Sequence, residues 1–396
     1  MKQALLCIFL SLFLLSCETN RQTKDISVIV RDGLNFSVEQ YKLMVRSLSD
    51  SASYPRATNP SDESLVTSGT EWWCCGFFPG SLWYLYEFSG DQNILAEAVS
   101  RTAPLEVLKL KTTTHDLGFM LNNSFGNGYR LTANPTYKDI LIRGAGSLAS
   151  RYNPTVGCIR SWDHGNWEFP VIIDNMMNLE YLFRVFKITG DSTFYRIAIS
   201  HADKTIQNHY RTDWSSYHLV DYNPSTGQVI RKQTVQGAFD ESAWARGQAW
   251  GLYGFTVVYR ETGNKKYLEV AKKIADFILD HPNMPSDLIP YWDFNAPGIP
   301  NAKRDASAAV ITSSALLELQ KYVDTDLSKK YLDSAEKIIR TLSSPAYRAR
   351  LGEDNNFILM HSVGSLPANS EVDVPLSYTD YYYIEALMRL RDILAK

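Results

Sequence analysis

Ten segments of the chain carry apolar residues at intervals of three and four positions, and this pattern constrains the fold more than any other feature. Such spacing places apolar side chains on one face of a helix. Strand-like alternation is scarce, and only residues 217–235 predict a short hairpin, with its turn at Asn223–Gly227. The chain is therefore predicted to be all-α. The predicted helices span residues 36–50, 91–112, 137–151, 170–188, 194–210, 242–262, 264–280, 305–323, 327–343 and 380–394.

Three corners between predicted helices share one sequence pattern. Tyr86–Asp91, Phe186–Asp191 and Tyr259–Asn264 each end one helix with Gly and begin the next with Asp or Asn. Gly adopts the left-handed conformation of a helix C-cap, and Asp or Asn accepts a hydrogen bond at an N-cap. Residues 322–326 are a degenerate fourth copy. Repeated helical hairpins predict an open solenoid or a closed toroid, and closure would let one domain use all of residues 36–396.

The N-terminus predicts export. An apolar run, Ala4–Leu15, follows Lys2 and is too short to span a membrane, so residues 1–16 are predicted to be a signal peptide. The run leads into Ser16-Cys17, which resembles a bacterial lipobox whose Cys becomes lipid-modified; an ordinary signal peptide with a chance Cys is the alternative. Residues 17–35 are polar and are predicted to be a tether. We expect an exported bacterial lipoprotein, held to a membrane only by its lipid, on the periplasmic side or at the cell surface.

Composition excludes several classes of protein. The 396 residues include 40 Lys+Arg and 43 Asp+Glu without a basic run, which argues against nucleic-acid binding. The seven His are scattered and no His-Glu-x-x-His occurs, so no metal site is predicted. Gly144-Ala145-Gly146 lacks the preceding strand of a dinucleotide site. Apart from Cys7 in the signal segment and the lipobox Cys17, three Cys remain, an odd number without a Cys-x-x-Cys, so buried free thiols are expected at Cys74, Cys75 and Cys158.

Two carboxylates are candidates for catalysis. Asp174 falls among apolar residues in the predicted helix 170–188, where Pro170 suits the first turn. Burial there raises a carboxyl pKa, as a general acid requires, and a nearby Asp116 would raise it further. The helix N-terminus opposes this by favouring the anion. The non-catalytic alternatives are that Asp116 caps the N-terminus of a helix and that Asp174 makes a structural hydrogen bond.

A third segment combines charge with aromatic surface. Arg246 and Trp250 stand four residues apart on a predicted helix that Asp240 or Ser242 caps. A planar guanidinium beside an indole suits a sugar that bears a carboxylate. A cation–π pair at a helix crossing is the structural alternative. The aromatic run Trp72–Gly80, which ends in Pro-Gly before a helix, is either a stacking platform or a corner of the core.

These segments resemble the unsaturated glucuronyl hydrolases, glycoside hydrolase family 88. The resemblance covers nearly the whole chain after about residue 60, and its landmarks occur in the family's order. They are Trp73-x-x-Gly76-Phe77-x-Pro79-Gly80, His115-Asp116-x-Gly118-Phe119, Ile173-Asp174-Asn175-Met176-Met177-Asn178, Trp244-Ala245-Arg246-Gly247-Gln248-Ala249-Trp250 and Asp380-Tyr381-Tyr382-x-x-Glu385-Ala386-Leu387.

The resemblance implies an (α/α)6 barrel and a glycosidase that removes a 4,5-unsaturated uronic acid from the non-reducing end of lyase-generated oligosaccharides. It implies that the acid protonates C4 of a vinyl ether and water adds at C5, without a metal or an organic cofactor. Asp174 takes the role of acid and base, and Asp116 assists it. The implied substrate-binding residues are Trp73, Phe77, His115, Trp162, His218, Gln236, Arg246 and Trp250.

Two other functions stay open at this point. The unsaturated rhamnogalacturonyl hydrolases of family 105 share the barrel and the hydration chemistry, although the Trp244–Trp250 run favours family 88. A non-catalytic glycan-binding lipoprotein would need the aromatics and Arg246 but not both Asp116 and Asp174. The parent polysaccharide, its linkage and sulfation, and the oligomeric state are left open.

Overall fold

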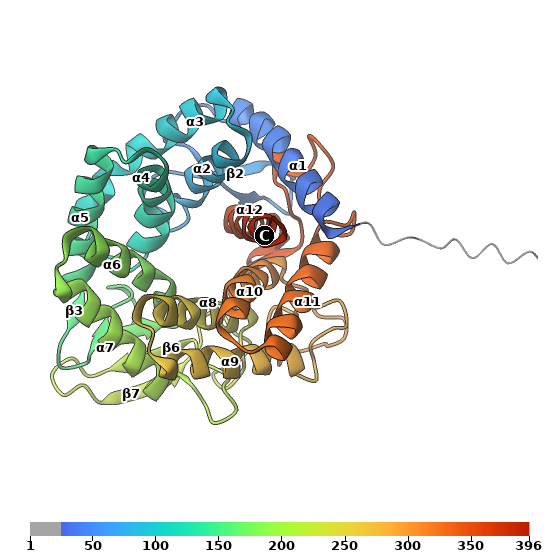
Figure 1. The fold of residues 1–396 in the computed structure, drawn as a ribbon. Coiled ribbons are helices and arrows are strands. Elements are labelled where there is room, and N and C mark those ends of the chain that lie inside the picture. Colours follow the sequence, from blue (N-terminus) through green and yellow to red (C-terminus); the bar gives the residue numbers. More distant parts are fainter. Residues whose placement is uncertain (1–24, 396) are drawn as a thin grey trace, which may run out of the picture.

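The computed structural model describes residues 25–395, which form a ring of six inner and six outer helices (Figure 1). The inner helices are α2 (Phe77–Ser89), α4 (Asn127–Thr132) with the π-helical segment Gly118–Gly126 before it, α6 (Asn175–Thr189), α8 (Ala245–Thr262), α10 (Ala306–Leu319) and α12 (Ser377–Leu394). The outer helices are α1 (Ile26–Ser47), α3 (Gln92–Thr102), α5 (Pro135–Ala149), α7 (Ser192–His209), α9 (Lys265–Asp280) and α11 (Thr325–Leu342).

Contacts between neighbouring inner helices close the ring. Each inner helix packs on the next, and α12 packs against α2, so the last helix of the chain contacts the first inner one. Helix α1 lies outside α12, which pairs the two ends of the described chain. The closed toroid, an (α/α)6 barrel, is therefore confirmed over the open solenoid.

The predicted corners are confirmed. Gly90, Gly190 and Gly263 end α2, α6 and α8 with φ of 67°, 75° and 65°, and the Asp or Asn that follows each one caps the next helix. Asp324 caps α11 in the degenerate copy. A fifth corner was not predicted, because Ala133 takes the left-handed conformation in place of Gly. We call this side of the barrel, at the C-terminal ends of the inner helices, the corner end.

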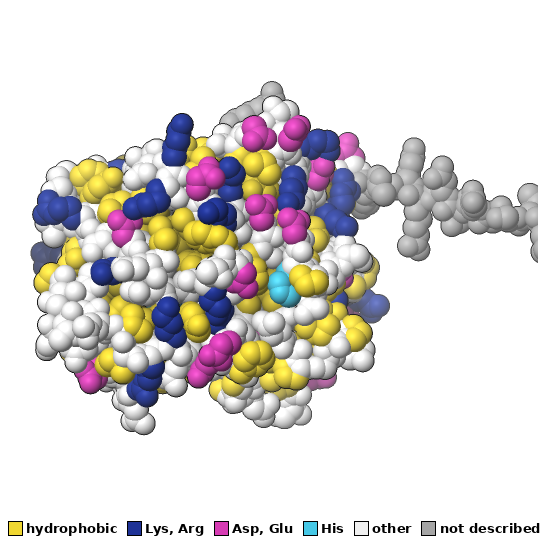
Figure 2. Space-filling model, turned by 90° about the horizontal axis from the view of Figure 1, so that it is seen from below, with side chains coloured by type: hydrophobic (Ala, Val, Ile, Leu, Met, Phe, Trp, Pro, Cys, Tyr) yellow, Lys and Arg dark blue, Asp and Glu magenta, His cyan; other side chains and the backbone are white. Residues whose placement is uncertain are grey.

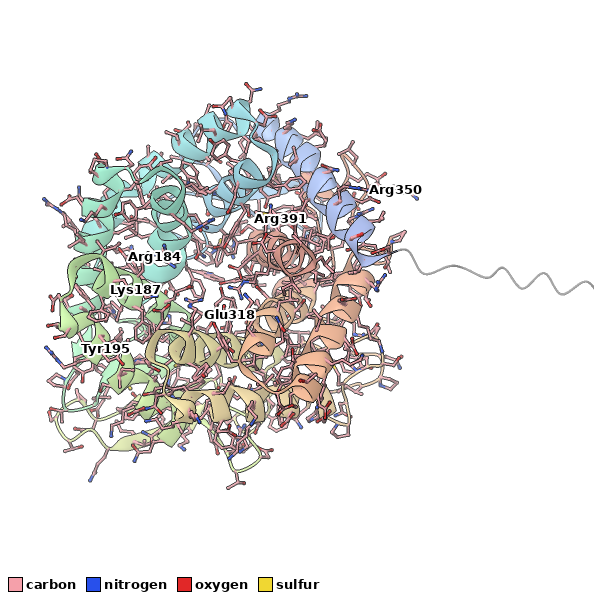
Figure 3. The ribbon with its side chains drawn as sticks, viewed as in Figure 1. Arg184, Lys187, Tyr195, Glu318, Arg350 and Arg391 are labelled. Carbon is pink, nitrogen blue, oxygen red and sulfur yellow. The ribbon has the colours of Figure 1, made fainter. Side chains whose placement is uncertain are left out.

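Ion pairs join four inner helices at the corner end. Arg260 of α8 contacts Glu180 of α6 at 2.6 Å and Glu318 of α10 at 3.0 Å. Arg389 of α12 contacts Glu318 at 3.1 Å and Glu385, one turn away, at 3.3 Å. Figure 3 looks onto this end, with Glu318 near the barrel axis. The network fixes the inner helices relative to one another where the connections are shortest.

The opposite side of the barrel, which we call the strand end, carries the long connections. The nine short strands of residues 25–395 all lie in these connections, and the predicted hairpin is confirmed, with a third strand beside it. The strands are β1 (Tyr54–Thr58), β2 (Leu65–Ser68), β3 (Tyr152–Asn153), β4 (Cys158–Ile159), β5 (Pro170–Ile172), β6 (Leu219–Tyr222), β7 (Val229–Gln233), β8 (Ser362–Ser365) and β9 (Ser370–Val374). Short 3-10 turns cover Ala103–Leu110, Gln320–Tyr322 and Asp354–Asn356.

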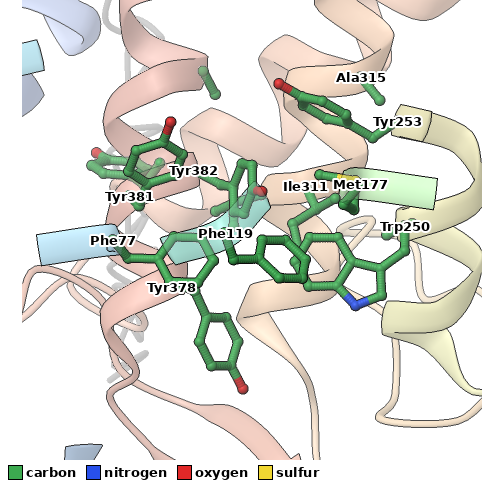
Figure 4. Close-up of a cluster of buried hydrophobic side chains, with 14 of the residues drawn as sticks. Phe77, Phe119, Met177, Trp250, Tyr253, Ile311, Ala315, Tyr378, Tyr381 and Tyr382 are labelled. Carbon is green, nitrogen blue, oxygen red and sulfur yellow. The ribbon is translucent and has the colours of Figure 1, made fainter. Parts of the chain in front are cut away.

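Aromatic side chains fill the barrel axis. Phe77, Phe119, Trp250 and Tyr382 from four different segments contact one another with ring centroids 5.2 to 5.9 Å apart (Figure 4). Burial of such large rings supplies much of the hydrophobic stabilisation of a core. On the outside, in the view of Figure 2, basic and acidic side chains are mixed, in keeping with the nearly balanced charge.

Two predicted boundaries are wrong. Helix α1 begins at Ile26, so residues 26–35 of the predicted tether belong to the barrel; Ile26, Val30 and Leu34 repeat every fourth residue on its buried face. Helix α6 begins only at Asn175, because residues 170–172 form β5 and pair with β6. The proposed signal peptide 1–16, Cys17 and residues 18–24 lie outside the described residues.

Other local predictions have clear outcomes. Cys74, Cys75 and Cys158 are buried free thiols, as expected, and burial raises the pKa of Cys74 to about 12. Helix α8 begins after Trp244 without a side-chain cap, so neither Asp240 nor Ser242 caps it. Within residues 25–395 no helix is both long and apolar enough to cross a bilayer.

The corner glycines give a test of the fold. Gly190→Ala forces a Cβ into the left-handed region, where no neighbouring atom lies within 4 Å, so only backbone strain changes. We expect a loss of about 1 kcal/mol in the free energy of unfolding, measured by urea denaturation. Gly146→Ala is the matched control: it lies exposed in α5 with equal space, and the variant should gain about 0.5–1 kcal/mol. Equal effects of the two substitutions would contradict the corner assignment.

Candidate active site

The candidate residues gather at the strand end, where the N-terminal ends of the inner helices meet. Phe77 begins α2, Asp174 precedes α6 and Arg246 is the second residue of α8. Asp305 precedes α10 and Tyr378 is the second residue of α12. Residues from different helices touch here: Phe77 packs on Tyr378, and Arg246 pairs with Asp305. Ring closure therefore brings sequence-distant groups into one site.

Asp174 is a buried carboxyl with an unsatisfied oxygen. Only 9% of the residue is exposed, and its Oδ2 has no hydrogen-bond partner among the described residues. Burial raises the pKa of Asp174 to about 7; the Arg246 charge opposes this rise and the Asp116 charge adds to it. The carboxyl is thus poised to hold or release a proton near neutral pH, as a general acid and base requires. Its position as the residue before α6, after β5, differs from the predicted one inside the helix.

His218 presents an N–H to this carboxyl. Its Nδ1 accepts the backbone N–H of Val235 at 2.9 Å, so the proton of the neutral ring lies on Nε2. That Nε2 is 3.7 Å from Asp174 Oδ2 and has no partner within hydrogen-bond distance. Burial lowers the pKa of His218 to about 3, so the ring is neutral at physiological pH.

Trp250 adds a third unpaired polar atom. Its indole N–H is buried without a hydrogen-bond partner, yet it lies close enough to Asp174 to help lower the pKa of that carboxyl. Buried polar groups are normally paired, and an unpaired one costs free energy. Three such atoms around Asp174, Oδ2 of the carboxyl itself and the N–H groups of His218 and Trp250, mark where the polar atoms of a bound molecule belong.

Asp116 and His115 lie on the segment before the π-helix. Asp116 accepts a hydrogen bond from Thr114 Oγ1 at 2.6 Å and keeps 18% of its side chain exposed. His115 is buried, with Nε2 3.2 Å from Asp116 Oδ1. Burial lowers the pKa of His115, and the Asp116 charge opposes this shift. Asp116 is therefore no side-chain cap, and it is near enough to Asp174 to raise the pKa of that carboxyl.

The side chain of Arg246 is buried and is held in place by hydrogen bonds. Its guanidinium donates to Asp305 Oδ2 at 3.2 Å and to the carbonyls of Val363 and Gly364 on β8. Its Cζ lies 4.5 Å from the centre of the Trp244 ring and 5.3 Å from that of Tyr378, so its cation–π partners are these two rings and not Trp250, four residues along the helix. The side chain is only 2% exposed. Arg246 therefore shapes the site and supplies positive charge near Asp174 without offering a free fork at the surface.

The predicted aromatic wall has an exposed layer and a buried layer. Trp73 is half-buried and packs on Phe119 and Tyr378, with centroids 5.4 and 5.0 Å away. Phe77 has no exposed surface, so it supports this wall from behind and does not line it. Trp162 is half-buried and joins the His115 segment through a bridge to Thr114.

Gln236 completes the set at the strand end. Its Nε2 donates to the Gly364 carbonyl at 3.3 Å, the same carbonyl that accepts from Arg246. The sequence reasoning missed Tyr378, whose buried hydroxyl has no partner, and Asp305, which holds Arg246. Two sequence signals could have identified these residues. Tyr378 lies two residues before the motif that begins at Asp380, and Asp305 is the first residue of a predicted helix.

The raised pKa of Asp174 predicts how stability depends on pH. A carboxyl whose pKa is higher in the folded state keeps a proton that the unfolded chain releases, so stability falls as pH rises through about 7. Asp174→Asn removes this titration. We expect the free energy of unfolding of the variant, relative to the unmodified protein, to be higher at pH 8 than at pH 5 by about 1 kcal/mol or more. Asp62→Asn, on the surface, is the control and should show equal effects at both pH values.

No protein-family model matches the chain. Known proteins do match it over most of its length. An unsaturated glucuronyl hydrolase from Formosa agariphila is 45% identical over 346 residues, which is 87% of this chain and 86% of that protein. One from a Bacillus species is 33% identical over 345 residues, covering 85% and 90%. An unsaturated chondroitin disaccharide hydrolase from Streptococcus pyogenes is 30% identical over 369 residues, covering 91% and 90%.

Solved structures agree with these matches. The crystal structure of an unsaturated glucuronyl hydrolase specific for heparin superposes with a TM-score of 0.91 at 47% identity, over 93% of this chain and 99% of that one. The enzyme from Bacillus sp. GL1 superposes with a TM-score of 0.84 at 30% identity, over 92% and 97%. With its barrel closed around a buried carboxyl and its relatives matched over most of their length, the chain belongs to the unsaturated glucuronyl hydrolases.

Proposed function

We propose that this enzyme hydrates the C4=C5 double bond of a 4,5-unsaturated uronic acid at the non-reducing end of an oligosaccharide, with Asp174 as acid and base. The single observation that carries the proposal is the state of Asp174. Its pKa lies near 7 and its Oδ2 is buried and unpaired, beside two N–H donors that are unpaired as well. A proton donor in that state needs no reorganisation before it reacts.

Asp174 serves as donor and then as acceptor for the two proton transfers of the hydration step. Asp174 donates its proton to C4 of the vinyl ether, and positive charge develops at C5 and the ring oxygen. The Asp174 carboxylate then takes a proton from the water whose oxygen bonds to C5. The resulting hemiketal opens its ring, and the C1 hemiacetal so exposed expels the rest of the oligosaccharide as an alcohol. Asp174 ends protonated, ready for another cycle.

The surroundings suit a negatively charged sugar. The N-terminal ends of the inner helices converge here, and helix N-termini favour anions. Buried Arg246 adds a full positive charge near Asp174. We assign the N–H groups of His218 and Trp250 to hydrogen bonds with the sugar, Gln236 to the frame of the site through the Gly364 carbonyl, and the half-buried Trp73 and Trp162 to the aromatic wall. Asp116, with His115 beside it, keeps the pKa of Asp174 high.

The relatives indicate the substrate class. Their names place them on heparin and on chondroitin disaccharides, and the heparin-specific one is the more similar of the two. We propose unsaturated disaccharides from glycosaminoglycans as substrates, with heparin-type ones preferred. A panel of such disaccharides, followed by the loss of double-bond absorbance, ranks them directly.

Turnover of an unsaturated disaccharide tests the acid assignment. Asp174→Asn keeps the shape of the side chain but has no proton to transfer, so kcat should fall about 100-fold or more. Asp139→Asn, which removes an exposed carboxylate on the outer helix α5, is the control and should retain activity. In deuterated water, deuterium should appear at C4 of the released uronate. Efficient cleavage of a saturated glucuronide would contradict the hydration mechanism.

We propose further that the mature protein is anchored through Cys17, on the strength of the lipobox-like sequence Leu14-Leu15-Ser16-Cys17. Cys17→Ser should shift the protein from the membrane fraction to the soluble fraction, or leave it unprocessed, with the activity of the barrel unchanged. Metabolic labelling with a fatty acid gives the direct readout. An unmodified protein that is soluble without the substitution would contradict the anchor.

A further inference from the structure

A short piece of chain at the end of β4, residues 159–162, holds the segment that carries Asp116; we call it the β4 segment. The Ser161 carbonyl accepts the backbone N–H of His115 at 3.0 Å, and a bridge to Thr114 adds a second backbone contact. These contacts lie one and two residues before Asp116. The position of Asp116 therefore depends on where the β4 segment lies.

The same segment also holds the chain on both sides of Asp174. Before this carboxyl, the backbone N–H of Ile172 donates to the Ser161 hydroxyl at 3.0 Å. Directly after it, the side chain of Asn175 donates through Nδ2 to the Ile159 carbonyl at 2.8 Å. The two carboxylates of the site are thus connected through one short piece of chain, which fixes how they lie relative to each other.

Two fully buried side chains hold Ile159 from different helices. Asn175, the first residue of α6, binds its carbonyl, and His201 of the outer helix α7 accepts its N–H through Nδ1 at 3.0 Å. Because both backbone groups of Ile159 are bound in this way, the β4 segment cannot shift without breaking a buried hydrogen bond, which is costly. Neither side chain has a role in the hydration chemistry itself.

Both of these side chains are buried at a cost. The Oδ1 of Asn175 and the Nε2 of His201 have no hydrogen-bond partner among residues 25–395. A buried polar atom without a partner lowers the stability of the fold, and an unpaired group in a native structure calls for a reason. Control over the β4 segment, next to the reacting carboxyl, is such a reason.

We propose that Asn175 is a positioning residue for the hydration: by binding Ile159 it holds Asp116 in place relative to Asp174, and His201 supports Ile159 from the opposite side. The inference rests on the proposed function and adds to it two residues that touch neither the substrate nor the reacting atoms. It makes the outer helix α7 part of the frame of the site.

The groups that face the Asp174 carboxyl decide what a loss of this hold would do. They are Asp116, Arg246, His218 and the indole of Trp250. Burial raises the pKa of Asp174, the Arg246 charge opposes this rise, and the Asp116 charge adds to it; His218 is neutral at physiological pH. If Asp116 moves away, one of the causes that raise the pKa of Asp174 is lost, and this pKa falls.

The pH dependence of kcat/KM tests the proposal, because its alkaline limb reports the acid of the free enzyme. Asn175→Ala removes the donor to Ile159. We expect kcat to fall about tenfold with KM within about twofold, and the alkaline limb to move to lower pH by about 0.5 unit. His201→Leu removes the acceptor and should move the limb in the same direction. His201→Asn keeps an acceptor and should leave the limb near its original pH.

Asn127→Ala is the matched control. Asn127 is also a buried Asn whose Nδ2 donates to a backbone carbonyl, that of Asn123 at 3.0 Å, but it lies on α4, beyond the π-helical segment. The substitution should lower the melting temperature about as much as Asn175→Ala does. It should leave the alkaline limb where it is.

A shifted limb in Asn175→Ala and His201→Leu, absent from the control, supports the positioning role. An unchanged limb in Asn175→Ala, or an equal shift in Asn127→Ala, overturns it. If Asn175→Ala does not fold, the two His201 variants decide by the same criterion. Retained activity in Asp174→Asn would show that the proposed function itself fails. An inactive Asp174→Asn together with an unchanged limb in Asn175→Ala would show that only the positioning role fails.

Discussion

The packing of α12 between α10 and α2 is the contact on which the rest of the structure depends. It joins the last helix of the chain to the first inner helix and turns a row of helical hairpins into a ring. Only a ring makes the N-terminal ends of the inner helices converge on one axis. At the other end, ion pairs join four of these helices, α6, α8, α10 and α12, through Arg260, Arg389, Glu180, Glu318 and Glu385.

Closure of the ring also explains why the active site lowers the stability of the folded state. The ring buries Asp174 and leaves its Oδ2 and two neighbouring N–H groups without partners. Water would pair these groups in an open structure, and the carboxyl pKa would be ordinary. Burial in the closed ring raises the pKa of Asp174 to about 7. The feature that makes the carboxyl a useful acid is thus the feature that makes the folded state less stable.

Residues around the carboxyl divide into those that touch the reaction and those that hold the frame. Arg246 illustrates the difference. From its spacing with Trp250 it suggested a free fork for a carboxylate, yet its donors go to Asp305 and to the carbonyls of β8. It acts through position and charge.

By itself the sequence determined local features: ten of the helical segments, although not α2 or the segment 118–132, and the places of the Gly and Asp corners. These follow from periodicity and capping, which act within a few residues. The free thiols followed from the number and spacing of the Cys. Tertiary structure decided what depends on distant partners. Pro170 to Ile172 became a strand because β6 was there to pair with it, and residues 26–35 became helix because α12 covers their apolar face. Ring closure also buries Asp174 without a partner for its Oδ2 among the described residues, and it supplies the hydrogen-bond acceptors that take up the guanidinium of Arg246. The sequence could not show this, because the groups that bury or bind these side chains lie far away in the chain.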